Sequence, residues 1–587
     1  MNDTAFTSEQ TEYLKGFFTG VSQRKDIQFP FAGVTNNGLL TSNPEMSDGI
    51  NLASENVHGI SVDELSKEEV IKFEKHGLDV WDDILSHADK NMFPEGGNVF
   101  RWKFHGLFYV SPAQEALMLR CRIPAGLLTS HQLRALGKIA DDFGGGYAHI
   151  TTRANFQIRE IMPRDTVRVL LALRDCGLTS QGAGADNIRN ITASPTSGFD
   201  PHEIYDVLPL AKAMHHYILN TRDMYDLPRK FNISFDGGGL ISSCTDTNDI
   251  GFYAARSVKN PADIRFRVFL AGISGHKQLA FDCGLALKPE QCIAVAAAMI
   301  RVFRKNGDRT NRKKARLKYL IDSWGQEKFL EETQKSLEFP LEFIPQDQFS
   351  ARPDVEMSAH TGIHSQRQPG FNYIGINIPV GRLTPDQMGG LADLSEKYGR
   401  GELRLTVWQN ILIPHIHESH IGAAVKALDD LGLSIKHNPV CSAIIACTGS
   451  RGCKYSSTDT KSHAMDVGKY LSERITLDLP INIHFTGCPH SCAQHYCGDI
   501  GLIGVKIKQG SKNVEGYNIV VGGGVDNSRG IGRKLKDQVS AEHVPAFIEG
   551  CVLNYLKYRH PDESFHNFVN RLTDEELNTY LLDDGNN

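Results

Sequence analysis

The 587-residue sequence contains no apolar run long enough to span a bilayer, and its first 23 residues lack the apolar core of a secretory signal. It also lacks both common glycine-rich phosphate loops, G-x-G-x-x-G between a strand and a helix and G-x-x-x-x-G-K-[ST]. Its net charge of −6 provides no global basic field to attract nucleic acid. We therefore expect no membrane span, no nucleic-acid partner and no nicotinamide or flavin site. Electrons for any redox reaction would then come from another molecule.

Cysteine is also scarce. There are twelve cysteines, and eight lie singly along the chain, which is typical of a reducing cytoplasm and not of a disulfide scaffold. The other four form the patterns C-x5-C (Cys447, Cys453) and C-x3-C (Cys488, Cys492) in turn-rich segments. Four thiolates can hold a cubane iron–sulfur cluster, because sulfur is a soft ligand and each iron needs one outer ligand. A four-cysteine zinc site and four unrelated buried thiols are the alternatives, although structural zinc usually has two to four residues between paired cysteines.

The sequence repeats itself at an offset of 255 residues. Ile123-Pro-Ala-Gly-Leu-Leu-Thr129 aligns with Ile378-Pro-Val-Gly-Arg-Leu-Thr384, and the match continues for more than fifty residues without a gap. The two threonines are candidate N-caps of amphipathic helices, and residues 147–152 and 402–407 are predicted strands. The pattern predicts an α+β fold.

A second match has an offset of 250 residues. It aligns Asn232-Ile-Ser-Phe-Asp-Gly237 with Asn482-Ile-His-Phe-Thr-Gly487, directly before Cys488. Two long offsets of similar size indicate a duplicated module with a pseudo-twofold axis, and ligand sites often form where such halves meet. We expect one half to supply the four cysteines and the other half to face them.

The half that faces the cysteines is rich in basic residues. Lys230 leads into the strand whose repeat runs into Cys488, and it shares a strand face with Asn232, as Arg120 does with Arg122. Convergent cations require an anionic partner, and arginine suits carboxylates and other oxyanions. Residues 301–318 hold nine Lys or Arg, which could instead form a solvated helix face.

Over about residues 100–555, the sequence resembles the sirohaem- and [4Fe–4S]-containing assimilatory nitrite and sulfite reductases. The motifs that carry the resemblance are Leu119-Arg-Cys-Arg-Ile-Pro124, Thr151-Thr-Arg-Ala-Asn-Phe-Gln-Ile-Arg159, Leu227-Pro-Arg-Lys-Phe-Asn232, Cys447-Thr-Gly-Ser with Cys453, Thr486-Gly-Cys-Pro-His-Ser-Cys492 and Asp499-Ile-Gly-Leu-Ile-Gly504. The family shows the same internal duplication.

The resemblance implies ferredoxin-like and sirohaem-binding modules, each present twice and related by the pseudo-twofold axis, in a three-domain arrangement. The expected segments are a loop-rich N-terminus with a helix (1–105, helix 64–88), ferredoxin-like repeat A (106–185), sirohaem half A (186–350), ferredoxin-like repeat B (351–435) and sirohaem half B with the cysteines (436–587). For residues 1–100 we predict no role beyond packing against or covering the core.

The resemblance also assigns roles to residues. Cys447, Cys453, Cys488 and Cys492 would ligate the cluster, and Cys492 would also be the axial ligand of the sirohaem iron. The substrate pocket would contain Arg120, Arg189, Lys230 and Asn232. The carboxylates of the sirohaem, eight in number, would bind Arg122, Arg153, Gln157, Arg159, Arg309, Asn311 and Arg312.

The two branches of the family differ two residues after the pocket lysine, where sulfite enzymes have Lys and nitrite enzymes have Asn. Asn232 and the Cys-Pro-x-Ser-Cys pattern favour the nitrite branch, closest to ferredoxin-dependent nitrite reductase. We expect a cytoplasmic monomer that reduces nitrite to ammonium with six electrons from a ferredoxin-type donor. Sulfite reduction to sulfide, a precorrin-3B synthase-like monooxygenase and a zinc-stapled binding protein are the alternatives. His490 and Ala493 replace the usual Asn and Gly beside the cluster, where hydrogen bonds tune the redox potential.

Overall fold

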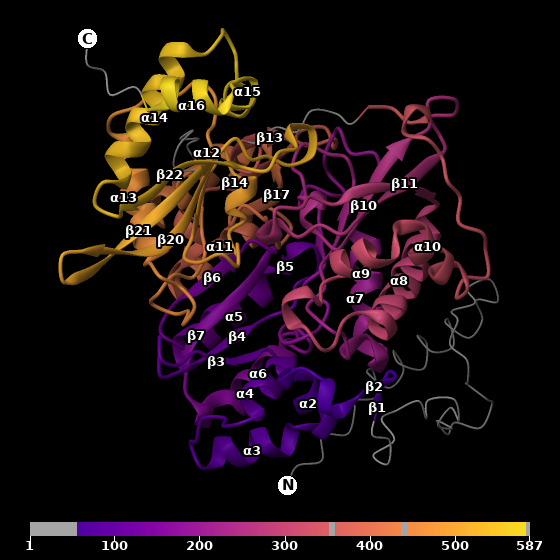
Figure 1. The fold of residues 1–587 in the computed structure, drawn as a ribbon. Coiled ribbons are helices and arrows are strands. Elements are labelled where there is room, and N and C mark those ends of the chain that lie inside the picture. Colours follow the sequence, from indigo (N-terminus) through magenta and orange to yellow (C-terminus); the bar gives the residue numbers. More distant parts are fainter. Residues whose placement is uncertain (1–55, 352–357, 436–442, 583–587) are drawn as a thin grey trace. The chain divides into compact units, whose positions relative to one another are not determined.

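The computed structural model describes residues 56–351, 358–435 and 443–582, and the chain from Asp63 onward forms one compact unit (Figure 1). The described residues of this unit contain four five-stranded sheets. A separate two-stranded ribbon precedes it, formed by β1 (Asn56–Val57) and β2 (Ile60–Ser61). The expected loop-rich stretch before residue 56 lies outside the described residues.

Two of the sheets are antiparallel and exchange a strand with each other. The first has the order β15 (Arg382–Leu383), β6 (Ala148–Thr151), β7 (Asn155–Ile161), β4 (Leu117–Arg120) and β3 (Leu107–Tyr109). The second has the order β5 (Leu127–Thr129), β16 (Glu402–Leu405), β17 (Ile411–His417), β14 (Phe371–Ile376) and β13 (Gly362–Ser365). Each ferredoxin-like repeat thus supplies an edge strand to the sheet of the other, so the two repeats fold as one interlocked body.

The helices of the two repeats begin in the same way. Thr129 caps α5 (Ser130–Phe143) in a capping box with Gln132, and Thr384 caps α11 (Pro385–Tyr398) with Gln387. In both copies the threonine hydroxyl accepts the backbone N–H of the glutamine at 3.2 Å, which satisfies a donor that the helix leaves free. The N-cap predictions are confirmed. The shorter helices α6 (Thr166–Asp175) and α12 (Ile421–Asp430) follow β7 and β17.

The other two sheets also form a matched pair. Their orders are β8 (Thr192–Ala193), β9 (Ile233–Asp236), β10 (Ile250–Arg256), β11 (Ile264–Leu270), β12 (Phe281–Leu287), and β18 (Ile444–Ala446), β19 (Ile483–Thr486), β20 (Ile500–Gln509), β21 (Lys512–Val521), β22 (Arg533–Ser540). In each sheet the first three strands are parallel and the last two pairings are antiparallel. The match of β9 with β19 confirms the second repeat, and with it the duplicated α+β fold.

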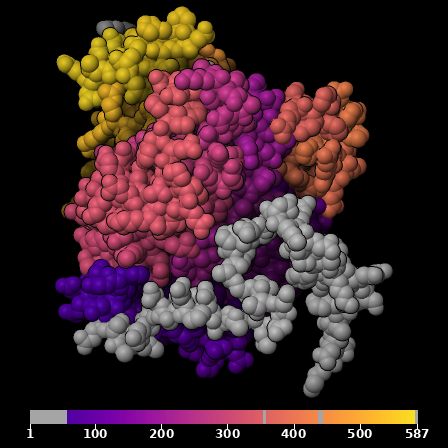
Figure 2. Space-filling view, turned by 90° about the vertical axis from the view of Figure 1, so that its right-hand side faces the viewer, coloured from indigo at the N-terminus to yellow at the C-terminus, as the bar shows by residue number. Residues whose placement is uncertain are grey.

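Helices flank each of these sheets and bury separate apolar cores. In the first half they are α7 (Leu208–Asn220), α8 (Cys292–Asn306), α9 (Leu317–Trp324) and α10 (Gln326–Gln334); in the second half they are α13 (Thr460–Ser472), α14 (Val544–Tyr558), α15 (Phe565–Arg571) and α16 (Asp574–Leu581). The coral-coloured residues from α8 to α10 form a broad part of the face in Figure 2. Within the described part of the chain, every helix is too short or too polar to cross a membrane.

The prediction of a single helix over residues 64–88 is wrong in one respect, because this segment forms two helices in the structure. It contains α2 (Lys67–Glu74) and α3 (Trp81–Asp89), joined by a short 3-10 turn, and α4 (Asn98–Arg101) follows. At the break Gly77 packs against Phe104, and a Cβ at Gly77 would lie 2.1 Å from that ring. The close approach of the two segments therefore ends α2 and starts a new helix.

Candidate functional site

The four cysteines lie in loops that follow two adjacent parallel strands, β18 and β19. Since parallel strands end at the same sheet edge, Cys447 after β18 and Cys488 after β19 are neighbours. The Gly487 N–H donates to Cys447 Sγ at 3.3 Å. The thiol of Cys488 interacts electrostatically with Cys492, Cys447 and Cys453. The structure thus brings the two predicted pairs into one group.

The chemistry of this group fits a cluster. Burial, together with the neighbouring thiols, raises the pKa of Cys488 to about 12, so the thiolates need a positive partner to form. Within the described ranges no three His, Cys, Asp or Glu side chains are gathered closely enough to hold one metal ion. A zinc ion needs its ligands around a single centre, whereas each cysteine of a cubane binds a different iron. The four cysteines that the structure gathers at one sheet edge can therefore hold an iron–sulfur cluster.

Cys492 differs from the other ten described cysteines, because it alone is exposed. Burial nevertheless raises the pKa of its thiol, so the sulfur is partly desolvated although the residue is accessible. Thr152 Oγ1 of the first ferredoxin-like repeat donates to the Cys492 carbonyl at 2.9 Å. The accessibility of Cys492 allows a second group to contact this residue.

Two cations from the first half of the chain, Lys230 and Arg120, lie near this thiol, and Arg189 lies beside them. The pKa of Cys492 is lowered by Lys230 and Arg120, although burial and the other cysteines outweigh them. Arg120 and Arg189 both donate to the Ala183 carbonyl, at 3.4 and 3.1 Å, which holds their guanidinium groups side by side. The predicted grouping of these cations near the cysteines is present in the structure.

These cations lack acidic partners. Among the described residues no carboxylate lies within ion-pair distance of Arg120, Arg189 or Lys230, and Lys230 Nζ has no hydrogen bond there either. Burial lowers the pKa of Lys230 to about 7 and that of Arg120 to about 10. The pKa of Arg189 falls well below its usual value through burial and through Arg120. Buried cations of this kind are stabilised by an anion, so the site fits an anionic ligand.

The backbone of Asn232 is held in place by Asp249. Its N–H donates to Asp249 Oδ2 at 2.8 Å, and Arg316 in turn binds both oxygens of Asp249, at 3.0 and 2.6 Å. The side-chain Oδ1 of Asn232 is buried and has no hydrogen-bond partner among the described residues. Asn232 therefore presents an amide that remains available for a ligand.

Arg159 contacts the cysteine loop directly, and Gln157 accepts a hydrogen bond from it. Arg159 donates to the Gly452 carbonyl at 3.0 Å, to Thr448 Oγ1 at 2.9 Å and to Gln157 Oε1 at 3.1 Å. These bonds join the first repeat to the loop between Cys447 and Cys453. Arg159 thus supports the cluster ligands, a role that its motif alone did not indicate.

Besides Gln157 and Arg159, the other five predicted carboxylate ligands also have partners within the protein. Arg122 is fully buried and donates to the Ile188 carbonyl at 2.6 Å, because the chain leaves β4 after Arg120 and the two arginines no longer share a strand face. Arg309 ion-pairs with Glu69 at 2.5 Å. Arg312 binds Asp186 through two nitrogens, and Asn311 accepts the Lys313 N–H at a helix start. Arg153 is bound too: it donates to Asn190 O at 2.6 Å and to Asn248 Oδ1 at 2.9 Å beneath the pocket.

Further basic residues reach the site without having been predicted. Arg229 and Arg316 lie close enough to Lys230 to lower its pKa. Lys461 of α13 is buried beside Cys447, and burial lowers its pKa to about 7. Arg229 could have been found from its place next to Lys230, whereas no sequence signal marks Lys461, which reaches the site only through the packing of α13.

The fold and the site therefore define an iron–sulfur protein with a cationic pocket between duplicated halves. The family model described as "Nitrite and sulphite reductase 4Fe-4S domain" matches residues 184–341 and 440–580, and "Nitrite/Sulfite reductase ferredoxin-like half domain" matches residues 110–176 and 364–431. The chain belongs to the nitrite and sulfite reductase family, whose members carry sirohaem and a [4Fe–4S] cluster. This confirms the resemblance. The predicted domain limits remain a prediction.

Several relatives match over most of the chain. A ferredoxin–nitrite reductase from Synechococcus elongatus is 35% identical over 507 residues, covering 84% of this chain and 97% of its own length. An assimilatory ferredoxin-dependent nitrite reductase from Haloferax mediterranei is 30% identical over 543 residues, covering 86% and 91%. The solved structure of the Mycobacterium tuberculosis NirA protein superposes with a TM-score of 0.81 at 27% identity, covering 87% of this chain and 97% of that one.

Proposed function

We propose that this protein is a ferredoxin-dependent nitrite reductase, which reduces nitrite to ammonium with six electrons at a sirohaem coupled to a [4Fe–4S] cluster through Cys492. The observation that carries the proposal is the grouping of Arg120, Arg189 and Lys230, without carboxylate partners, beside the exposed thiol of Cys492. A small oxyanion and an anionic macrocycle both supply the missing negative charge. The names of the relatives from S. elongatus and H. mediterranei support nitrite and ferredoxin.

The residues of the pocket would bind and protonate the substrate. When bound, the sirohaem supplies an iron that passes electrons to the anion. Arg120 and Arg189 each use an N–H group on the Ala183 carbonyl, so the remaining N–H groups can bind oxygen atoms of nitrite. Lys230 can donate a proton as an N–O bond breaks, because its ammonium is not held by any carboxylate of the described chain.

Arg153, Gln157 and Arg159 remain our proposed contacts to the sirohaem carboxylates. Arg159 supports this, since its Nε is buried without a partner among the described residues. Arg159 already bonds to the Cys447–Cys453 loop, so an added carboxylate at Nε would complete its hydrogen bonds.

Asn232 supports nitrite over sulfite as the substrate. A lysine at this position would add a fourth cation to the pocket, which suits the doubly charged sulfite more than the singly charged nitrite. The side chain of Asn232 is uncharged instead, and its backbone is fixed by Asp249. Sulfite reduction stays the second candidate, because Arg120, Arg189 and Lys230 suit either anion.

We also propose that the protein works as a monomer in the cytoplasm. All eleven cysteines in the described ranges are free, and cluster ligands must be reduced to bind iron. Sedimentation and cell fractionation test these two points.

The function is tested with purified holoenzyme and reduced methyl viologen as an artificial donor. We expect faster turnover of nitrite than of sulfite, and a loss of nitrite turnover in Lys230→Met with unchanged cofactor spectra. Lys335→Met is the control, because Lys335 forms only an exposed ion pair with Glu332. Faster sulfite turnover by the unmodified protein would contradict the choice of substrate. Activity with NADH alone would contradict the external donor.

A further inference from the structure

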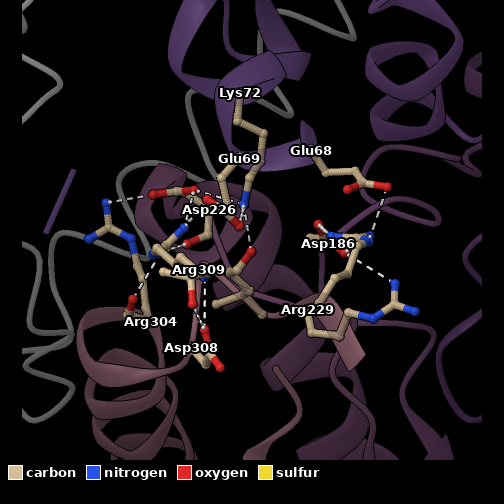
Figure 3. Close-up of polar contacts among 12 residues, drawn as sticks. Glu68, Glu69, Lys72, Asp186, Asp226, Arg229, Arg304, Asp308 and Arg309 are labelled. Carbon is tan, nitrogen blue, oxygen red and sulfur yellow. Dashed lines mark hydrogen bonds and ion pairs between the residues drawn. The ribbon is translucent and has the colours of Figure 1, made fainter. Parts of the chain in front are cut away.

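A buried ion-pair network joins α2 to the segment that carries Lys230. Lys72 Nζ donates to the Leu227 carbonyl at 2.7 Å and ion-pairs with Glu69 at 2.7 Å and Asp226 at 3.3 Å. Arg309 pairs with Glu69 at 2.5 Å and Asp226 at 3.3 Å. Figure 3 shows Glu69 and Lys72 extending from α2 toward Asp226 and Arg309. The side chains of Lys72, Glu69 and Arg309 are at most 3% exposed, so this is an interior network.

A second arm of the network reaches Arg229. Glu68 of α2 lies 3.3 Å from Arg312, which binds both oxygens of Asp186 at 2.7 and 2.8 Å. Asp186 also lies 3.7 Å from Arg229 (Figure 3). Burial would raise the pKa of Asp186, but Lys72, Arg312 and Arg229 outweigh it and the pKa is lowered. The carboxylate of Asp186 is therefore charged and firmly held.

The two arms fix the backbone on both sides of the pocket. Leu227 N–H donates to the Asp186 carbonyl at 3.3 Å, and Arg189 N–H donates to the Phe231 carbonyl at 2.8 Å. The segments that carry Arg189 and Lys230 are thus paired with each other, and α2 holds one end of that pair. The acids of the network are occupied by cations outside the pocket, so none of them neutralises Lys230.

We propose that α2 is a positioning element for the anion pocket, with Lys72 holding the Asp226–Asn232 segment so that Lys230 faces Cys492. This rests on the proposed function. It gives the N-terminal part of the described chain a role in substrate binding, although α2 contributes no residue to the pocket itself. Lys72 acts through Leu227 and Asp226, and so it is a positioning residue.

The test compares Lys72→Met with Arg267→Met in the full-length holoenzyme. Arg267 is a matched control: its side chain is 6% exposed, it ion-pairs with Asp282 at 2.6 Å and it donates to the Ile344 carbonyl at 2.9 Å. Both variants therefore lose a buried cation bound to a carboxylate and a backbone carbonyl. The readouts are the nitrite Kd from absorbance titration, KM against kcat, and deuterium uptake of the peptide covering residues 226–235.

For Lys72→Met we expect a nitrite Kd and KM raised about tenfold or more, because small displacements of positioned groups have large effects. Deuterium uptake in residues 226–235 should accelerate, with sirohaem and cluster spectra unchanged. Arg267→Met should leave Kd, KM and this uptake at their original values. Wild-type nitrite affinity in Lys72→Met, or an equal loss in Arg267→Met, would overturn the proposal.

A milder variant covers the case in which Lys72→Met does not fold. Glu68→Gln removes only the contact with Arg312, where both side chains are partly exposed, and should raise the nitrite Kd severalfold. An unchanged Kd would count against the second arm. If the unmodified protein neither binds nor reduces nitrite, the proposed function fails, while equal uptake in Lys72→Met and wild type separately refutes the positioning role.

Discussion

The duplication places two equivalent carboxylates, Asp249 and Asp499, in different surroundings. Each accepts a backbone N–H at 2.8 Å from the asparagine before the equivalent strand, Asn232 in one copy and Asn482 in the other. Asp249 also pairs with Arg316 at 2.6 Å. Asp499 forms no ion pair among the described residues, and burial raises its pKa from 3.8 to about 7. Substitution by asparagine should therefore stabilise the protein at Asp499 and destabilise it at Asp249.

The expected change in the free energy of unfolding follows from the pKa of Asp499. A folded-state pKa raised by about three units corresponds to about 4 kcal/mol of lost stability when Asp499 is ionised. The folded protein then binds the proton more tightly than the unfolded chain, so stability falls as the pH rises from about 4 to about 7. Asp499→Asn removes this penalty and keeps an acceptor for the Asn482 N–H. Asp249→Asn leaves Arg316 buried without its charge partner, which costs about 3–5 kcal/mol.

Thermal unfolding at pH 5 and pH 8, followed by circular dichroism, measures both effects. We expect Asp499→Asn to raise the Tm at pH 8, with a smaller gain at pH 5, and Asp249→Asn to lower the Tm at both pH values. A lower Tm for Asp499→Asn at pH 8, or shifts of the same sign in the two variants, would refute the reasoning.

Three further predictions concern the site. Asn232→Lys should raise the ratio of sulfite to nitrite kcat/KM by about tenfold, measured with methyl viologen, and an unchanged ratio would show that this residue does not select the anion. Gly452→Ala should shift the reduction potential of the cluster, measured by EPR titration, because the new Cβ would lie 2.4 Å from the Arg159 guanidinium; an unaltered potential would mean that the loop absorbs the change. Lys454→Glu, beside Cys453, should raise the KM for an acidic ferredoxin severalfold without affecting methyl viologen activity, whereas Lys534→Glu on β22 should change neither. Equal effects of the two lysine variants would contradict a donor site near Cys453.

Local chemistry explains which features could be predicted from the sequence. Thr129 and Thr384 are recognisable because a capping box needs only residues three positions apart. The grouping of Cys447 with Cys488 is indicated by the paired spacing of the four cysteines, and the structure achieves it through the parallel pairing of β18 with β19.

The missed features depend on contacts between distant segments. The exchange of β5 and β15 between the repeats leaves no mark in either copy, because short edge strands have no distinctive pattern. Arg309 belongs to a basic run, but its partner Glu69 lies 240 residues earlier. The resemblance implied a cofactor contact for Arg309, whereas the structure pairs it with the buried carboxylate of Glu69.

The most direct test of the account is the spectrum of Cys492→Ser, compared with Cys497→Ser as a control at a nearby buried cysteine. Because we propose that Cys492 couples the cluster to the sirohaem, its loss should disturb the Soret band and the EPR signal of the reduced cluster together, while Cys497→Ser retains both. A Cys492→Ser protein whose Soret band and cluster signal both match those of the unmodified protein would contradict it.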